Sequence, residues 1–391
     1  MLAAQAHEDP DAAAPARRPL RVAGIDPELG FGGGEVQVLG LTLELLRRGH
    51  RAEIFCDPRG QLMERARGVG VNCYPLSIRN SIDIRAGLRL RGMLAADDYD
   101  IVHFHTARAH ALAPYARGLV GARVVTRRMD YRPNRLFAPW LYNHSVEGVA
   151  AISEGVTAAL TEAGVDRSRI AIIPSGIDET RFRPPSPAER DAARARWALA
   201  TGDFAIGAVG ALEPRKGHRV MLAALAKLSG GAENRASERP FRCLVAGDGS
   251  IREMLINETR GLGVEGRVRF IGRVEDTREL LWALDLFVMP SLKEGLGVAL
   301  LEAMGCGLAC IASNVGGAGA AVADGCGIAV RPGDTGALAD AIARMIASDD
   351  ARRELGTAAR ARVIERYTLG ASAEATLKFY FKSLQNAGWG I

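Results

Sequence analysis

The sequence predicts an α/β protein made of two doubly wound, Rossmann-like domains that face a central cleft. The chain has 391 residues, and a typical size of about 150 residues per domain suggests two or three domains. Short apolar runs alternate with longer segments whose apolar residues recur every three or four positions. A proline-rich break divides this alternation into two similar halves. Strands that are apolar throughout are typical of parallel sheets covered by helices on both faces.

The first half contains six runs rich in branched apolar residues, each of which predicts a buried strand. They are RVAGID at 21, RAEIFC at 51, DIVHFH at 100, ARVVTR at 122, GVAAIS at 148 and IAIIP at 170. The segment EVQVLGLTLELLRRGH between the first two runs has helical spacing. These elements form a predicted N-terminal domain over residues 19–184, and residues 1–18 are expected to be a disordered tail.

The second half begins after RFRPPSPAERD and repeats the same alternation. Its predicted strands are FAIGAVG at 204, FRCLVAG at 241, VRFIG at 268, LFVMPS at 286, LACIAS at 308 and GIAV at 327. They define a C-terminal domain over residues 185–368, and residues 369–391 are expected to form a helix that packs back toward the N-terminal domain. Ligands of such sheets bind beyond the carboxyl ends of the strands, so the cleft between the domains is the predicted site.

Composition narrows the class of protein. Hydrophobic residues make up 48% and charged residues 24% of the chain, which is ordinary for a globular protein. The tail has no apolar core of a secretory signal, and no apolar run approaches the roughly 18 residues that cross a bilayer, so a cytoplasmic protein is expected. The six cysteines are scattered, which favours a reducing compartment over a metal cage or a disulfide set.

The net charge of +5 favours an anionic partner of some kind. Zinc-finger, aromatic RNA-binding and basic-helix patterns are all missing from the sequence, so we expect no nucleic acid partner.

The first predicted strand is followed by DPELGFGGGEVQV, a glycine-rich turn that opens a helix. Backbone amides in such a turn can approach a phosphate closely, and the helix N-terminus adds a partial positive charge. Gly33 and Gly34 are the predicted contacts. A dinucleotide fingerprint, with Asp57 holding a ribose, is disfavoured because the glycine spacing is wrong and Glu35 stands where the third glycine belongs. A purely structural turn stays open as an alternative.

In the second half, the strand FAIGAVG leads into ALEPRKGH. Arg215 and Lys216 follow a strand end, where two adjacent cations could hold a diphosphate without a metal. The alternative is an ordinary solvated surface. The loops AGDGS at 246 and IGRVED at 271 also follow strands and are expected at the same edge.

The segment EGLGVALLE carries two acids separated by seven residues, Glu294 and Glu302. Glycines at 295 and 297 disfavour a helix before about Leu296, so Glu294 is placed in the loop and Glu302 in the second helical turn. Free amides of the first turn would then face the cleft between two carboxylates. This layout suits a ligand with many hydroxyls and an anionic centre. A helix start with an exposed Glu302 is the alternative.

The segment DDYD at 97–100 contains an Asp-x-Asp pair, a pattern that can hold a metal ion. The segment precedes a strand and so lies at the amino end of the sheet, opposite the cleft. We therefore expect a solvated turn there and no metal.

Several stretches together resemble glycosyltransferase family 4, whose members are retaining nucleotide-sugar transferases with the GT-B fold. They span about residues 21–370 and comprise GGGEVQVLGLTLELLRRGH, DIVHFHTARAH, AAISEGVTAALTEAGVDRSRIAIIPSGIDETRFRP, VGALEPRKGH, RVRFIGRVEDTRELLWALDLFVMPSLKEGLGVALLEAMGCGLACIAS and GGAGAAVADGCGIAVRPGD. The two glutamates, placed after Pro-Ser and before AMGCG, are the most specific of these signals.

The resemblance implies a role for each matching position. Glu302 would bind the donor ribose and Glu294 the transferred sugar, while Arg215 and Lys216 would neutralise the diphosphate. The remaining implied donor contacts are the backbone of Gly272, Arg273 and Val274 at the base, amides of Leu296, Gly297 and Val298 at the sugar and phosphates, Gly34 at a phosphate, and His105 at the sugar. From the residues alone, a lone histidine at a strand end is more often structural.

Two departures from the family pattern leave the donor open. Ala211 stands where many relatives carry an arginine, and Ala320 where many carry a glutamate. The base, the sugar and the acceptor are therefore not predicted.

The acceptor is expected at the first domain, where RVVTRRMDYRPNR supplies several arginines. Some lipopolysaccharide-core transferases resemble this chain in an Arg-Arg-x-Asp segment, here Arg127 and Arg128. A phosphorylated glycolipid at the inner membrane face is one hypothesis, since basic patches attract anionic lipid. A soluble acceptor and a solvated basic face stay open.

The predicted function is thus metal-independent, retaining transfer of a sugar from a nucleoside diphosphate sugar to a hydroxyl acceptor. A sugar-nucleotide binding protein that has lost transfer activity, and a nicotinamide-dependent oxidoreductase, are the alternatives.

Overall fold

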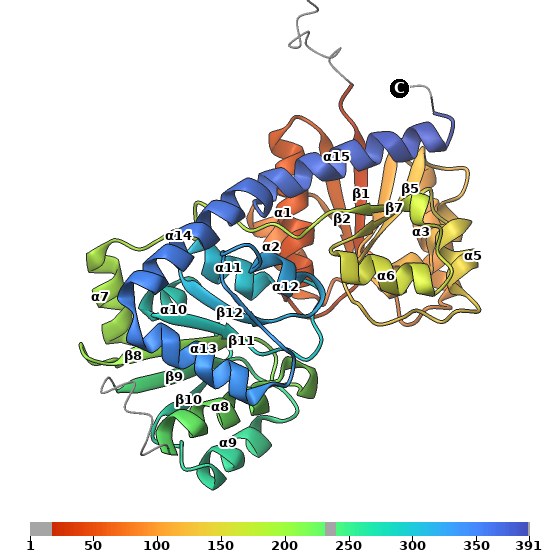
Figure 1. Cartoon of the computed structure of the whole chain (residues 1–391). Coiled ribbons are helices and arrows are strands. Elements are labelled where there is room, and N and C mark those ends of the chain that lie inside the picture. The colour runs from red at the N-terminus through yellow and green to blue at the C-terminus, as the bar shows by residue number, and fades with distance from the viewer. Residues whose placement is uncertain (1–17, 231–239, 390–391) are drawn as a thin grey trace, which may run out of the picture.

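The computed structural model describes residues 18–230 and 240–389. Apart from Arg18, the tail expected at residues 1–18 lies outside them. Two parallel sheets stand side by side, each with helices on both faces (Figure 1). The predicted fold of two Rossmann-like domains is therefore confirmed.

The N-terminal sheet has, in the described part of the chain, the strand order β3-β2-β1-β4-β5-β6-β7, with every pairing parallel. Its strands are β1 (Arg21–Asp26), β2 (Arg51–Cys56), β3 (Cys73–Pro75), β4 (Ile101–Phe104), β5 (Ala122–Arg127), β6 (Gly148–Ala151) and β7 (Ile170–Ile172). Its helices are α1 (Gly33–Arg47), α2 (Gln61–Gly68), α3 (Ile84–Ala95), α4 (Ala107–His110), η1 (Ala113–Ala116), α5 (Ala138–Asn143), α6 (Glu154–Glu162) and η2 (Arg167–Arg169).

The C-terminal sheet has the order β10-β9-β8-β11-β12-β13 and is also parallel over the described residues. Its strands are β8 (Phe204–Val209), β9 (Phe241–Ala246), β10 (Val268–Gly272), β11 (Leu286–Met289), β12 (Ala309–Ser313) and β13 (Ile328–Val330). Its helices are α7 (Pro187–Arg196), η3 (Pro214–Lys216), α8 (His218–Gly230), α9 (Arg252–Gly261), α10 (Arg278–Ala283), α11 (Val298–Gly305), α12 (Gly316–Ala321), α13 (Thr335–Ala347) and α14 (Asp349–Arg366).

Each apolar run singled out in the sequence contains a strand, and one strand was missed. The missed strand, β3, is only three residues long and ends in Pro75, so it carries almost no periodic signal. The proline-rich break is partly ordered as α7, which starts at a capping box formed by Ser186 and Glu189 and packs on α10.

The two domains are joined by two crossings of the chain that lie beside each other. Ile177 and Thr368 form an isolated parallel bridge. Beyond it, α15 (Leu369–Asn386) packs against α1, β5 and β6 of the N-terminal domain (Figure 1). The buried side chain of Gln37 in α1 clamps the first crossing, since Nε2 donates to Gly176 O at 2.7 Å and Oε1 accepts from Gly176 N at 2.8 Å.

The carboxyl ends of β1 and β4, and of β8 and β11, are the points where the strand order of each sheet reverses. Such switch points hold ligands in doubly wound sheets. The segment 97–100 lies at the opposite, amino end, as predicted. However, the expectation that it is simply solvated is wrong for Asp100, which is 4% exposed and accepts hydrogen bonds from Arg21 N and the Arg18 guanidinium. None of the described helices is both long enough and apolar enough to cross a membrane.

Candidate functional site

A buried acid in the loop before α11 pairs with a lysine that follows the neighbouring strand of the sheet. Glu294 lies in this loop, is 9% exposed, and accepts from Lys216 Nζ at 2.5 Å and from Ser291 Oγ at 3.3 Å. Lys216 follows β8 and Glu294 follows β11, which are neighbours in the sheet. Two residues 78 positions apart therefore meet at one switch point, and a ligand at this place would face a cation and an anion together.

Gly217, which follows η3, allows the backbone there to pack closely against the residue that follows β11. Gly217 has φ +66°, and a Cβ there would overlap the Pro290 carbonyl oxygen. The Arg215 carbonyl accepts from Leu292 N at 2.8 Å, while its side chain pairs with Glu213 at 2.7 Å. The Arg215 side chain is therefore engaged locally, whereas the Lys216 side chain reaches Glu294.

Glu302 lies one turn into α11 and is half-buried. Its Oε2 accepts from Thr277 Oγ1 at 3.1 Å. Burial raises the pKa of Glu302 to about 7, because the loss of water outweighs the hydrogen bond from Thr277 and the charge of Arg181. A carboxylate with so few partners can still accept hydrogen bonds from ligand hydroxyls.

The loop after β10 reaches the other domain. Gly272 has φ +73°, and the exposed Arg273 donates from Nη2 to Phe31 O at 2.9 Å. Phe31 precedes α1, so this contact joins the two domains. Val274 is half-buried and packs against the main apolar core.

On the N-terminal side, the glycine-rich turn faces α11. A Cβ at Gly33 would come 3.3 Å from Val298 Cγ2, and one at Gly34 would come 4.0 Å from Arg128 Cδ. The Glu35 carboxylate folds back and accepts from Gly32 N at 2.6 Å. The N-terminus of α1 is thus set opposite the N-terminus of α11, with Leu296 and Gly297 immediately before the latter.

His105 follows β4 and is 5% exposed. Its ring stacks on His103 with the ring centroids 3.9 Å apart, and its carbonyl accepts from Arg128 Nη1 at 3.0 Å. Burial holds the pKa of His105 well below its usual range, so the ring is neutral. In turn, the His103 ring bonds to Thr126 Oγ1 at 2.6 Å and to Tyr380 OH of α15 at 2.7 Å.

The two arginines predicted for the acceptor lie on opposite faces of the sheet. Side chains alternate along a strand, and Thr126 and Arg128 share the face that carries His103 and His105. Arg127 points to the other face, where Nη2 donates to Tyr131 O at 3.0 Å and the guanidinium lies over the Tyr131 ring. Only Arg128 therefore joins the residues at the cleft.

Asp26 and Glu35 were not singled out from the sequence, and the structure places both beside Arg128. Asp26 ends β1 and is 1% exposed. Burial, reinforced by the neighbouring Glu35, raises the pKa of Asp26 to about 7. The available signal was an acid at the end of an otherwise apolar strand, at the first switch point.

The two domains touch directly between these groups. Gly295 lies so close to the Arg128 carbonyl oxygen that a Cβ at this position would overlap it. Apart from Arg127, the predicted residues of the N-terminal domain therefore lie on the side that meets the C-terminal domain. Within residues 18–230 and 240–389, no three His, Cys, Asp or Glu side chains come together in a way that could hold a metal ion.

Two sequence families match this chain and together cover most of it. The family described as Glycosyltransferase Family 4 matches residues 31–181, and that described as Glycosyl transferases group 1 matches residues 189–362.

Two similar proteins align over three quarters or more of this chain. The alpha-maltose-1-phosphate synthase of Mycolicibacterium smegmatis is 31% identical over 310 residues, which cover 75% of this chain and 76% of that protein. The D-inositol 3-phosphate glycosyltransferase of Rhodococcus opacus is 28% identical over 428 residues, covering 95% and 93%. Among solved structures, Anabaena HepE in complex with UDP-glucose superposes with a TM-score of 0.80 at 21% identity, covering 92% and 99%.

Proposed function

Because the chain belongs to glycosyltransferase family 4, we propose that its interdomain cleft binds a nucleoside diphosphate sugar and passes the sugar to a hydroxyl acceptor with retention of anomeric configuration. The observation that carries this proposal is the contact of Lys216 with Glu294 at 2.5 Å, with Glu302 on the helix that follows. A cation, two carboxylates and a helix N-terminus at one strand edge match the phosphates and hydroxyls of such a donor.

Each group then has a distinct role in donor binding. Glu302 accepts from the ribose hydroxyls and Glu294 from the hydroxyls of the transferred sugar. The backbone of Gly272, Arg273 and Val274 lies against the base. Two relatives support a sugar-phosphate chemistry, since their names describe glycosyl transfer to inositol phosphate and synthesis of a maltose phosphate.

The leaving diphosphate is stabilised without a metal ion in this proposal. Lys216 supplies a positive charge, Arg215 adds a second one from the same loop, and the amides of Gly297 and Val298 face the phosphates. Gly33 and Gly34 close on them from the N-terminal domain. Fixed charges and dipoles of this kind need no reorganisation as the negative charge develops.

In the chemical step the acceptor oxygen forms a bond to the anomeric carbon while the bond from that carbon to the phosphate oxygen breaks. Retention follows if attack occurs on the face from which the diphosphate leaves. The acceptor proton passes to the departing phosphate oxygen, so charge and atoms balance without a protein base. Neutral His105 is a hydrogen-bonding group in this step and not a proton carrier, since its pKa lies well below its usual range.

The donor half is tested by calorimetric titration of UDP, GDP and ADP, and of their common sugar derivatives, in the presence of a chelator. We expect one nucleotide to bind at micromolar concentration, and Glu302→Ala to weaken it about 10- to 100-fold, because one or two hydrogen bonds to a charged acceptor are lost. Glu354→Ala, an exposed glutamate on α14, is the matched control. Absence of binding by the wild type would overturn the proposal, and tight binding without any sugar turnover would favour a binding protein.

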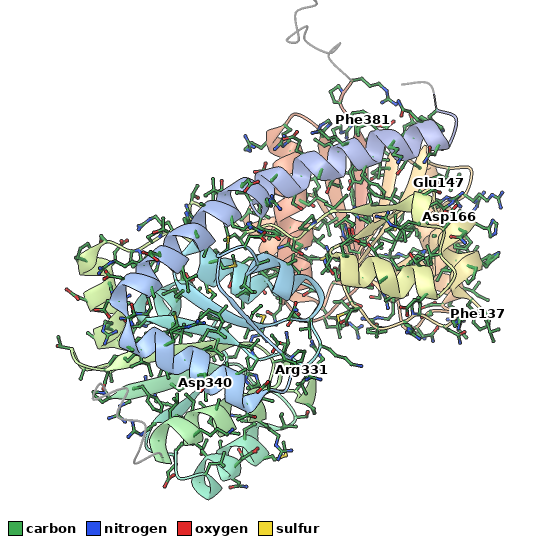
Figure 2. All side chains as sticks on the ribbon, viewed as in Figure 1. Phe137, Glu147, Asp166, Arg331, Asp340 and Phe381 are labelled. Carbon is green, nitrogen blue, oxygen red and sulfur yellow. The ribbon has the colours of Figure 1, made fainter. Side chains whose placement is uncertain are left out.

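A glycolipid acceptor at a membrane surface is the second part of the proposal. Large apolar side chains are exposed on the N-terminal domain at two places, Ile82, Ile84 and Leu88 around the start of α3, and Leu136, Phe137 and Trp140 around α5. Exposed arginines flank both places, namely Arg79, Arg85, Arg89, Arg132 and Arg135. Figure 2 shows Phe137 at the outer rim of this domain, away from the C-terminal domain.

Apolar side chains ringed by arginines match an anionic lipid surface better than they match water. We expect the protein to sediment with vesicles of phosphatidylglycerol and phosphatidylethanolamine and not with phosphatidylcholine alone. Replacing Leu136, Phe137 and Trp140 by serine should abolish sedimentation, whereas Met254→Ser, at an exposed apolar position of the other domain, should not. Equal sedimentation of the triple variant would exclude this rim as the membrane contact.

A further inference from the structure

Three neighbouring strands of the N-terminal sheet end in polar side chains that share one face. Asp26 ends β1, His105 follows β4 and Arg128 follows β5, and these strands are adjacent in the order β1-β4-β5. Helix α1 lies on this same face of the sheet. Its N-terminus, with Glu35 in the first turn, therefore covers the three side chains. Across the cleft stands the loop of Gly295, in contact with the Arg128 carbonyl.

Two buried polar atoms in this group have no partner. Oδ1 of Asp26 accepts from Glu28 N at 3.0 Å, but Oδ2 has no hydrogen bond within residues 18–230 and 240–389. In the same part of the chain, Arg128 donates through Nη1 to His105 O, while its buried Nε donates to nothing. Asp26 is 99% buried, as its exposed fraction of 1% shows, so bulk water does not satisfy the free oxygen.

The two unpaired atoms are complementary. Oδ2 of Asp26 needs a donor, Nε of Arg128 needs an acceptor, and the two side chains attract each other electrostatically without a hydrogen bond between them. A hydroxyl group is both a donor and an acceptor, so one hydroxyl can satisfy both atoms. Buried polar atoms are nearly always paired in native proteins, and an unpaired couple at a ligand cleft indicates a missing partner.

The surrounding charges favour a neutral ligand. The groups that face Asp26 are Glu28 in its own loop, Glu35 in α1, Cys56 in β2 and Arg128 after β5. Glu28 is itself paired with Arg108 at 2.6 Å. The carboxyls of Asp26, Glu28 and Glu35 thus outnumber the guanidinium groups of Arg108 and Arg128, and a phosphate in this place would be repelled by the acids.

We propose that Asp26, together with Arg128 and Glu35, forms the acceptor subsite and binds a hydroxyl of a neutral sugar or polyol unit. The inference rests on the proposed function, for which it supplies the acceptor half. Oδ2 of Asp26 accepts a hydrogen bond from the hydroxyl, Arg128 Nε donates to its oxygen, and the unit is held against the Glu294 loop. Any phosphate carried by the acceptor lies farther out, toward the exposed arginines of the rim. Asp26 is a binding and orienting group and takes no proton in the step.

The experiment compares Asp26→Ala and Asp26→Asn with the wild type, and uses Asp57→Asn as the matched control. Asp57 also follows a strand of the same sheet and is 2% exposed, but Arg59 pairs with it at 2.9 Å. Transfer from the best nucleotide sugar is measured to glycerol, myo-inositol and methyl glycosides, and to phosphate esters of the same compounds. Donor hydrolysis, in which water takes the acceptor's place, gives a second readout that needs no acceptor.

We expect Asp26→Ala to lower kcat/KM for the acceptor about 100-fold, because the charged hydrogen bond that binds and orients an acceptor hydroxyl is lost. The nucleotide dissociation constant should stay within about twofold, since Asp26 makes none of the proposed donor contacts. In the wild type, kcat/KM for the acceptor should rise with pH as the Asp26 carboxylate forms, and this dependence should vanish in Asp26→Asn. Asp57→Asn should show neither change.

Four outcomes would overturn the inference. Full transfer and hydrolysis by Asp26→Ala would mean that a bound water alone fills the place. Equal losses of transfer and of nucleotide binding would make Asp26 a structural anchor of the glycine-rich turn. Transfer to phosphate esters only, at a rate that Asp26→Ala leaves unchanged, would contradict a neutral subsite. Failure of the wild type to bind any nucleotide would overturn the proposed function itself, and the inference with it.

Discussion

Asp26 and Asp57 occupy neighbouring strand ends but have opposite environments. Arg59 lowers the pKa of Asp57 to about 2 by hydrogen bonding, whereas burial raises the pKa of Asp26 to about 7 from a usual value of 3.8. At 1.36 kcal/mol per unit, the raised value corresponds to a cost of about 4 kcal/mol for keeping Asp26 ionised in the folded protein. A residue that destabilises the fold and yet lies at the cleft is typical of a binding site.

This difference gives a prediction about stability. Between about pH 4 and pH 7 the folded protein holds a proton on Asp26 that the unfolded chain has released, so the free energy of unfolding falls as pH rises through this window. Asp26→Asn should therefore raise the melting temperature at pH 8 and have little effect at pH 5. Thermal unfolding at both values checks this.

Asp57→Asn should act in the opposite direction, lowering the melting temperature at pH 8, because its folded-state pKa is depressed and its ion pair is lost. If Asp26→Asn were the more destabilising of the two at pH 8, the cost assigned to the buried Asp26 carboxylate would be wrong.

At the same scale, the sequence located most of the candidate residues but not their surroundings. Glu294, Glu302 and Lys216 were found because carboxylates and a lysine next to glycines at strand ends have few structural uses. Arg127 and Arg128 were treated as a pair, and the alternation of side chains along β5 separates them. The sequence does not distinguish Asp26, because a strand-end aspartate is common and only its buried Oδ2, which lacks a hydrogen bond among the described residues, is unusual.

At the scale of elements, α1 links the site to the connection between the domains. Its first turn carries Gly33 over the cleft, Gln37 in the second turn clamps Gly176, and Gly40 in the third lies against Leu369 at the start of α15. A shift of the first turn of α1 would therefore move the contacts at Gly176 and at Leu369, where the chain crosses between the domains. This coupling depends on tertiary contacts of residues more than 130 positions apart, so periodicity could not predict it.

Gln37→Ala should lower the free energy of unfolding by about 1–3 kcal/mol, because the buried N–H and C=O of Gly176 would both lose their partner. Denaturation by urea measures the change. Gln385→Ala, at an exposed position near the end of α15, is the control and should lie within about 0.5 kcal/mol of the wild type. A Gln37→Ala protein as stable as this control would show that the clamp contributes nothing.

At the scale of the whole molecule, the domains meet in a closed arrangement in which the backbone of one touches the backbone of the other. Gly295 lies against the Arg128 carbonyl, and Arg273 donates to Phe31 O. The main apolar cluster also continues from one domain into the other. Closure of this kind excludes water from a reacting centre.

Gly295→Ala should hold the domains apart, because the added Cβ would overlap the Arg128 carbonyl oxygen. We expect a larger radius of gyration by small-angle X-ray scattering with bound nucleotide, and transfer reduced at least about tenfold, with a smaller change in nucleotide affinity. Gly30→Ala is the control, since a Cβ there meets nothing within 4 Å. An unchanged radius together with unchanged transfer would contradict this account of closure.

The sequence by itself determined the two-domain α/β fold, the family, and the loops that carry the proposed donor residues, because apolar period, glycine placement and strand-end charges are local properties. Tertiary structure alone decided which of these groups meet. It joined Lys216 to Glu294, turned Arg127 away from Arg128, and left Oδ2 of Asp26 without a hydrogen bond among the described residues. Pairing and burial depend on residues that are distant in the chain. For a buried charged group, the presence or absence of a partner determines its pKa and whether it is available to bind a ligand.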